Sequence, residues 1–517
     1  MTLSFDQLPV ATLSDILCSN AAFYPDRDAV VCGESRLTWK ALDRRVSQAA
    51  NGLILAGLAK GDKVAILTSN STDMVEIILA IGRAGCVVVP LSLLAPAAAL
   101  GRMVADSGAR AIFVSPSFDR VIEPELASLP EVRSRRFAVG FEAAEWTEYG
   151  PWRDGQSTTP PSVRVGVADE CVIIYSSGTT GTPKGIVHTH YNRANFALGL
   201  GIEYRFTTES VTLITTPLYS NGTWIMFLPT LLVHGRLIIM PKFDPGEFLR
   251  LIAKERITHT LMVPPQYQSV LSHPDLARTD LSSLRLLSSV GSTLRTDLKR
   301  RVMTEMAPVL LELYGLTEGI NTILRPEDVL RKADSVGTPG LGSDIRIIDD
   351  AGNELPRGQI GEIIGWGAGL MKGYHNRPDA TAEAIWVAPD GRTYLKTGDI
   401  GKLDDDGFLY ILDRKKDMIL SGAFNVYPRD IEEIAARHPD VGDVTVIGIP
   451  DPRWDEVPLA LIIPRAGVTP DLDAVKQWIN ERVGKHQRVA GVRQRESFPR
   501  NALGKILKKE LRAEYGS

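Results

Sequence analysis

Short apolar runs, each followed by an amphipathic segment, recur through the first 216 residues and constrain the fold more than any other feature. The runs are KVAILTS at 63–69, CVVVPLS at 86–92, AIFVS at 111–115, CVIIY at 171–175 and VTLITT at 211–216. Continuous apolar runs of this length are typical of strands buried on both faces, and helices between them provide the crossovers that parallel strands need. The pattern predicts an α/β architecture with largely parallel strands.

The character of the sequence changes twice towards the C-terminus. Near residue 340, short strands are separated by Asp-Ala-Gly-Asn and Pro-Arg-Gly turns, which predicts a β-rich subdomain at about 335–413. After the charged segment DRKKDMILSG, the chain has its own helix start at Pro428. We expect a large N-terminal domain over 1–413 and a small, mobile α+β domain over 414–517.

Charge and cysteine usage exclude several classes of protein. Lys and Arg number 58 against 62 Asp and Glu, without a polybasic block, so nucleic acid is not the expected partner. The cysteines Cys18, Cys32, Cys86 and Cys171 form no Cys-x-x-Cys pair, which indicates neither a disulfide framework nor a zinc site. With no apparent secretory signal, these features predict a reducing, cytoplasmic location.

The most apolar stretch is GTWIMFLPTLLVHGRLIIM, which Pro229, His234 and Arg236 interrupt. It falls short of the roughly 20 apolar residues that a membrane span needs. We therefore expect buried core here and no integral membrane association.

The stretch YSSGTTGTPKGIVHTH at 175–190 combines the ingredients of a phosphate-binding loop in an unfamiliar order. A P-loop requires Gly-x-x-x-x-Gly-Lys-Ser/Thr, whereas here Gly181 is followed by Thr-Pro-Lys. The hydroxyls and backbone N–H groups suit a polyphosphate, and Lys184 supplies positive charge for its outer phosphates. A flexible surface loop is the alternative when the stretch is taken alone. The segment before it, 139–170, is expected to be a surface connection.

Five further stretches follow the loop in the order and spacing of one family. They are LYGLTEG at 313–319, GEIIGWGAGLMKGY at 361–374, YLKTGDIGKLDDDGFLYILDR at 394–414, DRKKDMILSGAFNVYPRDIEE at 413–433 and PRNALGKILKKELR at 499–512. Through them the chain resembles, over essentially its whole length, the superfamily of acyl-CoA ligases, nonribosomal adenylation domains and firefly-type luciferases. Within this superfamily, the chain most resembles the aryl- or acyl-CoA ligases.

The resemblance implies a set of nucleotide-binding residues. It implies that Tyr314 packs on adenine, Thr317 and Glu318 hold the α-phosphate and its Mg²⁺, and Asp399 binds the ribose. The expected contacts are Ser176, Ser177, Gly178, Thr179, Thr180, Gly181, Thr182, Lys184, Gly291, Ser292, Tyr314, Gly315, Thr317, Asp399, Arg414 and Lys505. A carboxylate is the hard oxygen ligand that Mg²⁺ prefers. Taken alone, Thr317-Glu318 would be a helix cap and Asp399 a turn residue.

The expected catalytic residues are Thr180, Glu318 and Lys505. The resemblance implies that Lys505 contacts the reacting carboxylate and the α-phosphate, where it stabilises charge in the transition state. A lysine in such a basic tail would otherwise be a solvated charge. Lys416 is the implied hinge about which the small domain rotates between two half-reactions.

The resemblance places the acyl group beside TPLYSNGTW at 216–224, with Tyr219, Ser220, Asn221 and Gly315 as the expected pocket. Ser220 departs from the family pattern, because many relatives carry His there. Ser421, Gly422 and Trp454 are the implied coenzyme A contacts, with a packing role for Trp454 left equally open. His188 and His190 lack a third metal ligand and are interpreted as structural residues.

The implied activity is an ATP-dependent, AMP-forming acid–CoA ligase for a hydrophobic aryl, alicyclic or fatty acid. The implied cofactors are ATP, Mg²⁺ and coenzyme A, the partners are small molecules, and a homodimer is left open. A stand-alone enzyme that loads a carrier-protein phosphopantetheine is the alternative. A nucleotide-binding protein without catalysis is a third possibility, which the intact Thr179, Glu318, Asp399 and Lys505 disfavour.

Overall fold

The computed structural model describes residues 11–176, 184–421, 424–500 and 505–515. The chain forms two compact units, which are described separately below. Unit 1 consists of Met1–Ala333, Pro339–Asp344 and Trp366–Glu383, and unit 2 of Asp334–Thr338, Ile345–Gly365 and Ala384–Ser517. The domain boundary expected between 413 and 414 stays a prediction.

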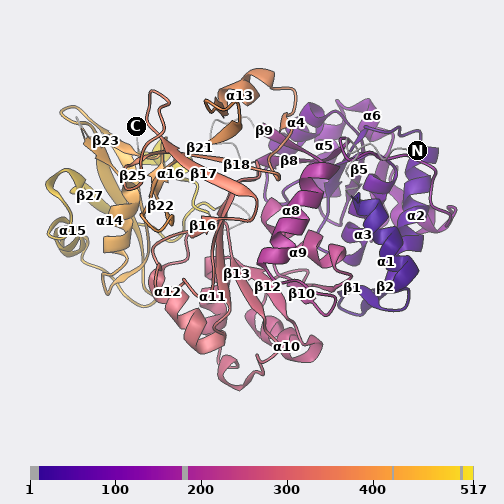
Figure 1. Ribbon diagram of the computed structural model, residues 1–517, viewed down its shortest axis with the longest axis horizontal. Coiled ribbons are helices and arrows are strands. Elements are labelled where there is room, and N and C mark those ends of the chain that lie inside the picture. The colour runs from indigo at the N-terminus through magenta and orange to yellow at the C-terminus, as the bar shows by residue number, and fades with distance from the viewer. Residues whose placement is uncertain (1–10, 177–183, 422–423, 501–504, 516–517) are drawn as a thin grey trace. The chain divides into compact units, whose positions relative to one another are not determined.

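Two twisted sheets form the centre of unit 1 (Figure 1). The strand order of one is β19 (Gly373–Tyr374), β9 (Lys184–Thr189), β8 (Glu170–Ser176), β4 (Val87–Pro90), β3 (Lys63–Leu67), β5 (Ala109–Val114), β6 (Arg136–Ala138) and β7 (Thr147–Glu148). From β8 to β7 neighbouring strands are parallel, whereas β9 is antiparallel to both β8 and β19.

The second sheet of unit 1 is also parallel through its middle. Its order is β16 (Thr338–Pro339), β15 (Asn321–Leu324), β14 (Leu310–Gly315), β13 (Leu286–Ser289), β12 (His259–Met262), β10 (Val211–Ile214), β11 (Arg236–Ile239), β1 (Asp28–Cys32) and β2 (Ser35–Thr38). The β14–β15 and β1–β2 pairs are antiparallel, and the pairs between β14 and β1 are parallel. The apolar runs of the sequence became strands because burial on both faces requires continuous apolar residues.

Helices connect these strands and cover the sheets. The helices described in unit 1 are α1 (Leu13–Phe23), α2 (Trp39–Leu55), α3 (Thr72–Arg83), α4 (Ala97–Ser107), α5 (Asp119–Leu126), α6 (Pro130–Arg133), α7 (Tyr149–Asp154), α8 (His190–Glu203), α9 (Asn221–Leu232), α10 (Pro245–Glu255), α11 (Pro264–Leu271), α12 (Thr296–Arg301) and α13 (Pro378–Glu383). Helices α1, α2 and α3 pack on one another, as do α8 and α9 (Figure 1).

Helix α8 begins directly after β9 because Thr189 caps it. The Thr189 hydroxyl accepts a hydrogen bond from the Asn192 backbone N–H at 3.2 Å, and the Asn192 side chain accepts one from the Thr189 backbone at 2.9 Å. This reciprocal arrangement satisfies two backbone donors at the helix start. It fixes the direction in which α8 leaves the loop motif.

The apolar stretch around Pro229 forms core, as expected. It supplies α9, which is buried along almost its whole length, and β11. No helix in the described part of the chain is both long and apolar enough to cross a membrane.

The segment expected to be a surface connection is partly buried. It contains α7, where Tyr149 is 1% exposed and donates a hydrogen bond to the Glu76 carboxylate. Arg153, also on α7, lies 3.2 Å from the same carboxylate. The expectation was wrong for this helix, because a long-range ion pair with α3 allows polar residues to be buried.

Unit 2 contains an antiparallel sheet with the strand order β17 (Ser343–Ile348), β18 (Gly361–Gly367), β21 (Thr393–Leu403) and β20 (Ile385–Val387), and β22 (Leu409–Arg414) pairs with β21. This is the β-rich region that the turn-forming residues predict. Its β21–β22 hairpin brings Asp399 opposite Arg414 in the ladder.

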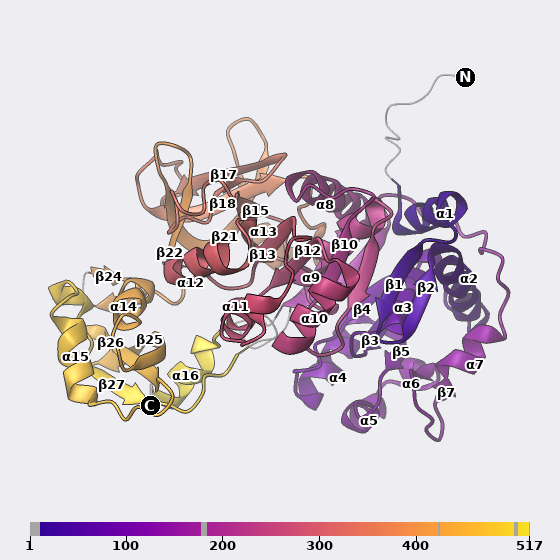
Figure 2. The ribbon, with the colours of Figure 1, turned by 90° about the horizontal axis from the view of Figure 1, so that it is seen from below.

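A second sheet of unit 2 has the order β24 (Phe424–Val426), β23 (Ile419–Ser421), β26 (Asp455–Pro464) and β25 (Val441–Asp451), with β27 (Gly491–Gln494) parallel to β26. Helices α14 (Pro428–Ala435), α15 (Leu472–Asn480) and α16 (Lys508–Tyr515) pack around it (Figure 2). Pro428 is the first residue of α14, as the sequence predicts. The α/β class, with a β-rich region and a small α+β part, is confirmed.

Candidate active site

Strands β8 and β9 hold the two ends of the loop motif beside each other. Ser176 pairs with Lys184, and Tyr175 pairs with Gly185. The residues between them, 177–183, lie outside the described residues, and with them the expected contacts Ser177, Gly178, Thr179, Thr180, Gly181 and Thr182. Ser176 ends β8, and the carboxyl ends of strands are where open α/β sheets bind ligands.

A segment from much later in the chain packs against the start of β9. The His375 backbone N–H donates to the Gly185 carbonyl at 2.7 Å, and Tyr374 pairs with Ile186. A Cβ on Gly185 would lie 2.9 Å from Ile173 and 3.2 Å from His375. Glycine is needed here because two neighbours occupy the space of a side chain.

Tyr374 connects two residues that the sequence assigns to ATP. Its hydroxyl donates a hydrogen bond to Glu318 Oε1 at 2.9 Å, and the Lys184 ammonium lies 4.9 Å from the centre of its ring. Burial, and then the neighbouring Glu318 charge, raise the pKa of Tyr374, so its hydroxyl remains a proton donor. Tyr374 lies within a quoted motif, but sequence reasoning missed it as a site residue.

His188 anchors the segment that contains Glu318. Its Nε2 lies 2.8 Å from the Thr317 carbonyl oxygen, a distance at which a protonated Nε2 donates a hydrogen bond. Burial, followed by the charge of Arg193, holds the pKa of His188 well below its ordinary value, so the ring is neutral. His188 therefore fixes the backbone next to Glu318, in agreement with its interpretation as a structural residue.

Asp106 of α4 joins β8 to the segment after Tyr374. The Tyr175 hydroxyl donates to Asp106 Oδ2 at 2.7 Å, and Arg377 contacts Asp106 Oδ1 at 2.8 Å. One carboxylate from α4 thus holds Tyr175 near the end of β8 and Arg377, three residues after β19. The contacts of Tyr374 and of Asp106 both lie close to the two described ends of the loop motif.

The expected adenine-side residues follow β13 and β14. Gly291 has φ of +93°, a conformation that favours glycine. Close to it, the Leu294 backbone N–H donates to Glu312 Oε1 at 2.9 Å, and the buried Lys299 ammonium lies 2.5 Å from Glu312 Oε2. This buried pair ties the Gly291–Ser292 loop to β14, the strand that ends with Tyr314 and Gly315.

The expected acyl residues lie at the start of α9. Tyr219 and Ser220 are buried, at 6% and 8% exposure, and Asn221 Oδ1 accepts a hydrogen bond from Arg193 Nη1 at 2.8 Å. Burial lowers the pKa of Arg193 to about 10. Its guanidinium carbon also lies 5.6 Å from the centre of the Phe196 ring, so Arg193 links Asn221 to α8.

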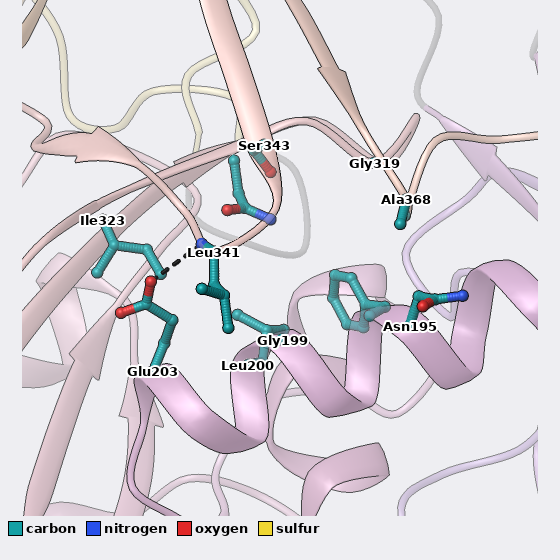
Figure 3. Close-up of a pocket in the computed structure, with 12 residues that line it drawn as sticks. Asn195, Gly199, Leu200, Glu203, Gly319, Ile323, Leu341, Ser343 and Ala368 are labelled. Carbon is teal, nitrogen blue, oxygen red and sulfur yellow. Dashed lines mark hydrogen bonds between the residues drawn. The ribbon is translucent and has the colours of Figure 1, made fainter. Parts of the chain in front are cut away.

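A separate pocket lies beside α8 (Figure 3). Its wall includes Phe196 and Leu200 of α8, Asn321 and Ile323 of β15, Leu341 and the first residue of β17, Ser343. Figure 3 shows Asn195, Leu200 and Glu203 along α8, with Leu341 above the Leu200–Glu203 end and Ala368 above Asn195. None of Tyr219, Ser220, Asn221 and Gly315 lines it.

In unit 2, the expected ribose residue is held by an ion pair. Asp399 Oδ1 lies 2.9 Å from Arg414 Nε across the β21–β22 hairpin, and Asp399 is 3% exposed. The pair brings together two residues that the sequence assigns to the ribose and phosphate. Both residues have further interactions, so the pair belongs to a larger polar cluster.

Two lysines belong to the same cluster. Burial, followed by the charge of Arg414, lowers the pKa values of Lys505 and Lys416 to about 8. Asp399 and Asp417 oppose this effect at both lysines. We call Lys416, Lys505, Asp399, Arg414 and Asp417 the lysine cluster. Unit 2 alone thus brings together four residues that the sequence singles out.

The expected coenzyme A residues lie near β23 and the β25–β26 turn. Trp454 is 42% exposed, and its ring lies 5.0 Å from the Arg453 guanidinium carbon. Ser421 pairs with Asp455, the residue after Trp454, and Gly422 lies outside the described residues.

Glu318 fits the expected Mg²⁺ site as a single carboxylate. The described residues include no group of three or more His, Cys, Asp and Glu side chains that could hold a metal. Mg²⁺ commonly binds through one or two carboxylates, substrate phosphates and water. Because Tyr374 orients one oxygen of Glu318, the other can face such an ion.

Comparison with known proteins identifies the family. Residues 18–375 match the family described as "AMP-binding enzyme", and residues 430–505 match "AMP-binding enzyme C-terminal domain". The chain belongs to the AMP-binding enzyme family. The resemblance drawn from its motifs is thereby confirmed.

Individual relatives match over nearly their whole length. Feruloyl-CoA synthase of an Amycolatopsis species is 35% identical, covering 96% of this chain and 97% of that protein. Medium/long-chain-fatty-acid–CoA ligase FadD8 of Mycobacterium tuberculosis is 31% identical, covering 95% and 88%. The crystal structure of ATP-bound MatB from Rhodopseudomonas palustris has a TM-score of 0.88 at 29% identity, covering 98% and 99%.

Proposed function

We propose that this protein is an AMP-forming acid–CoA ligase. The observation that carries the proposal is the Glu318–Tyr374–Lys184 arrangement beside the loop motif, in a chain that belongs to the AMP-binding enzyme family. A carboxylate for a metal and an ammonium for phosphates, both held by one aromatic side chain, suit a nucleoside triphosphate.

The reaction proceeds in two steps. First, an oxygen of the acid's carboxylate attacks the α-phosphorus of ATP, the bond to the bridging oxygen breaks, and pyrophosphate leaves. Then the thiol of coenzyme A loses its proton and attacks the acyl carbon, and AMP leaves with the electron pair of the broken C–O bond. No nucleophile from the protein is needed, because the substrates supply both nucleophiles.

Each site residue has a role in these steps. Lys184 holds the outer phosphates, Glu318 holds Mg²⁺, and Asp399 with Arg414 binds the ribose. When bound, Mg²⁺ neutralises phosphate charge. Lys505 stabilises negative charge that develops during the first step, and Lys416 is the pivot for the change to the second.

The two relatives favour coenzyme A as the acceptor and a hydrophobic acid as the substrate. One is named for feruloyl-CoA and the other for medium- and long-chain fatty acids, so both aryl and alkyl acids belong in a substrate screen. Transfer to a carrier protein is the less supported alternative.

The deciding experiment measures AMP and acyl-CoA by chromatography. The purified protein is incubated with ATP, Mg²⁺ and a panel of aryl, alicyclic and fatty acids, with and without coenzyme A. We expect at least one acid to give AMP and its acyl-CoA in equal amounts, with AMP release accelerated by coenzyme A. Acid-dependent AMP release that only a carrier protein accelerates would contradict the proposal.

The proposal also covers the location and the assembly of the protein. The protein acts in the cytoplasm, where the cysteines described, Cys18, Cys32, Cys86 and Cys171, remain free thiols as they are in the structure. A homodimer is the proposed assembly, and light scattering of the purified protein measures it.

A further inference from the structure

The pocket beside α8 adjoins the proposed nucleotide site through the β14–β15 hairpin. Gly319 lies in its wall and directly follows Glu318. Asn321, also in the wall, is the ladder partner of Gly315. The pocket therefore begins within two residues of the groups proposed to hold ATP, beside which the acid must react.

Glycines allow the segments around this pocket to approach one another closely. Gly319 has φ of +107°, and a Cβ on it would collide with the Gly369 carbonyl. A Cβ on Gly340 would collide with the Asn321 side-chain oxygen. The backbone segments at 319 and 369 approach closely, and the Asn321 carboxamide occupies the space over Gly340 because these positions have no side chain.

Two polar side chains in the wall are available to a ligand. Within the described chain, neither the Asn321 carboxamide nor the Ser343 hydroxyl has a hydrogen-bonding partner, and both residues are half-buried. Phe196, Leu200 and Ile323 make much of the remaining wall apolar. A few convergent polar groups in an apolar wall are typical of a site that reads one polar feature of its ligand.

Among the described residues of the wall, the only carboxylate is already neutralised. Glu203 Oε1 lies 2.6 Å from Arg325 Nη2 and accepts a hydrogen bond from the Leu341 backbone N–H at 3.0 Å (Figure 3). Its other oxygen accepts from Arg325 Nε at 3.1 Å. A charged ligand group would lose hydration here without gaining a counter-ion, so the pocket suits a neutral one.

The size of the pocket limits what enters. The space open to the centre of a water molecule is about 30 Å³. That is room for roughly one or two water molecules, whereas whole drug-sized ligands occupy roughly 300 Å³ or more. The pocket fits one substituent rather than an entire acyl group.

We propose that Asn321 and Ser343 select acids that carry a neutral hydroxyl or carbonyl at the end remote from the carboxylate. This inference rests on the proposed ligase function and specifies its substrate class. Asn321 offers both a donor and an acceptor, and Ser343 offers a rotating hydroxyl, so either substituent can be satisfied. An acid without such a hydroxyl or carbonyl would exclude water from the pocket and leave the Asn321 carboxamide and the Ser343 hydroxyl without a hydrogen-bonding partner.

The test compares matched acids. Benzoate, phenylacetate, cinnamate and octanoate are each paired with the form that is hydroxylated at the remote end, and acid-dependent pyrophosphate exchange gives kcat/KM for each. The proteins are the wild type, Asn321→Leu and Ser343→Ala. Ser269→Ala is the matched control, because Ser269 is exposed and its hydroxyl bonds only to Pro265 of its own helix, at 3.0 Å.

For the wild type we expect the hydroxylated member of at least one pair to be preferred by roughly 10-fold or more. Asn321→Leu removes that preference and keeps turnover of the unsubstituted acid within about threefold, because an apolar side chain leaves no amide unpaired. Ser343→Ala reduces the preference in part, and Ser269→Ala retains it. If Asn321→Leu is inactive with every acid, a reduced preference in Ser343→Ala still supports the proposal, and an unchanged one overturns it.

Two results would overturn the proposal while leaving the ligase function intact. One is a wild type that turns over unsubstituted acids as well as or better than every hydroxylated partner. The other is a hydroxyl preference that survives both pocket substitutions. Absence of acid-dependent exchange and thioester formation with the whole panel would instead overturn the ligase function, and the pocket proposal with it.

Discussion

Unit 1 and unit 2 hold their charged site residues in opposite ways. In unit 1, Tyr374 interacts favourably with both charged side chains. Its hydroxyl donates a hydrogen bond to the Glu318 carboxylate, and its ring lies beside the Lys184 ammonium. In unit 2, burial and the neighbouring cation Arg414 lower the pKa values of Lys505 and Lys416. Unit 1 therefore presents an arrangement built before ATP binds. Unit 2 presents cations whose charged form an incoming anion would stabilise.

The largest effect that this difference predicts is the loss of Lys505. If its charge acts on the transition state, Lys505→Ala lowers the rate of acid-dependent pyrophosphate exchange by roughly 100-fold to 1,000-fold, as for other preorganised donors. A supplied acyl-adenylate should still react with coenzyme A at a rate close to that of the wild type.

Lys509→Ala is the matched control, because Lys509 is an exposed lysine of α16, four residues after Lys505. Both half-reactions of this variant should match the wild type. Equal losses in the two half-reactions of Lys505→Ala would show that the lysine supports the fold of unit 2 rather than adenylation.

The next largest effect tests the arrangement in unit 1. Tyr374→Phe keeps the ring beside Lys184 but removes the hydrogen bond to Glu318, and a bond to a charged group contributes about 1.5–3 kcal/mol. We expect kcat/KM for ATP to fall roughly 10-fold, with a higher Mg²⁺ concentration needed for half-maximal exchange. Tyr191→Phe, on an exposed tyrosine of α8, is the control. An unchanged Mg²⁺ dependence would argue that Tyr374 does not orient the metal ligand.

A pH profile sharpens the contrast from the side of unit 2. The lowered pKa of Lys505, about 8, means that the lysine is charged below that pH and neutral above it. If the charged form of Lys505 acts in adenylation, kcat/KM for that step falls as pH rises, by roughly tenfold between pH 7 and pH 9. Lys416→Met removes a cation that lowers the pKa of Lys505, so the decline should move to higher pH. A profile flat to pH 9.5 would be incompatible with this assignment.

Local pattern and spacing predicted the parts of the molecule that depend on short segments. The runs KVAIL and CVIIY became β3 and β8, and Pro428 starts α14, because burial and chain stiffness act within a few residues. The order of the motifs was sufficient to identify the family, which the comparisons confirm. The assignments of individual site residues stay predictions.

Long-range side-chain contacts could not be predicted in the same way. Tyr374 is visible in the sequence as the last residue of a glycine-rich motif, but nothing local indicates that its hydroxyl donates a hydrogen bond to Glu318. The pocket wall likewise joins α8, β15 and the residues Leu341 and Ser343, which only the folded chain brings together. Pro151, Pro160 and Pro161 made the 139–170 segment look like a surface connection. Glu76 on another helix nevertheless stabilises the burial of Tyr149 and Arg153 on α7.

The smallest predicted effect concerns the surface of unit 2. At 42% exposure, Trp454 contributes little to the core. The guanidinium carbon of its neighbour Arg453 lies 5.0 Å from the centre of its ring. If coenzyme A packs against this ring, Trp454→Ala raises KM for coenzyme A about threefold, the scale of an exposed aromatic or cation–π contact. Pyrophosphate exchange should not change, because the thiol takes no part in adenylation. A fall in the melting temperature with no change in that KM would instead assign Trp454 to packing, and the contrast between the units would then rest on the lysine cluster alone.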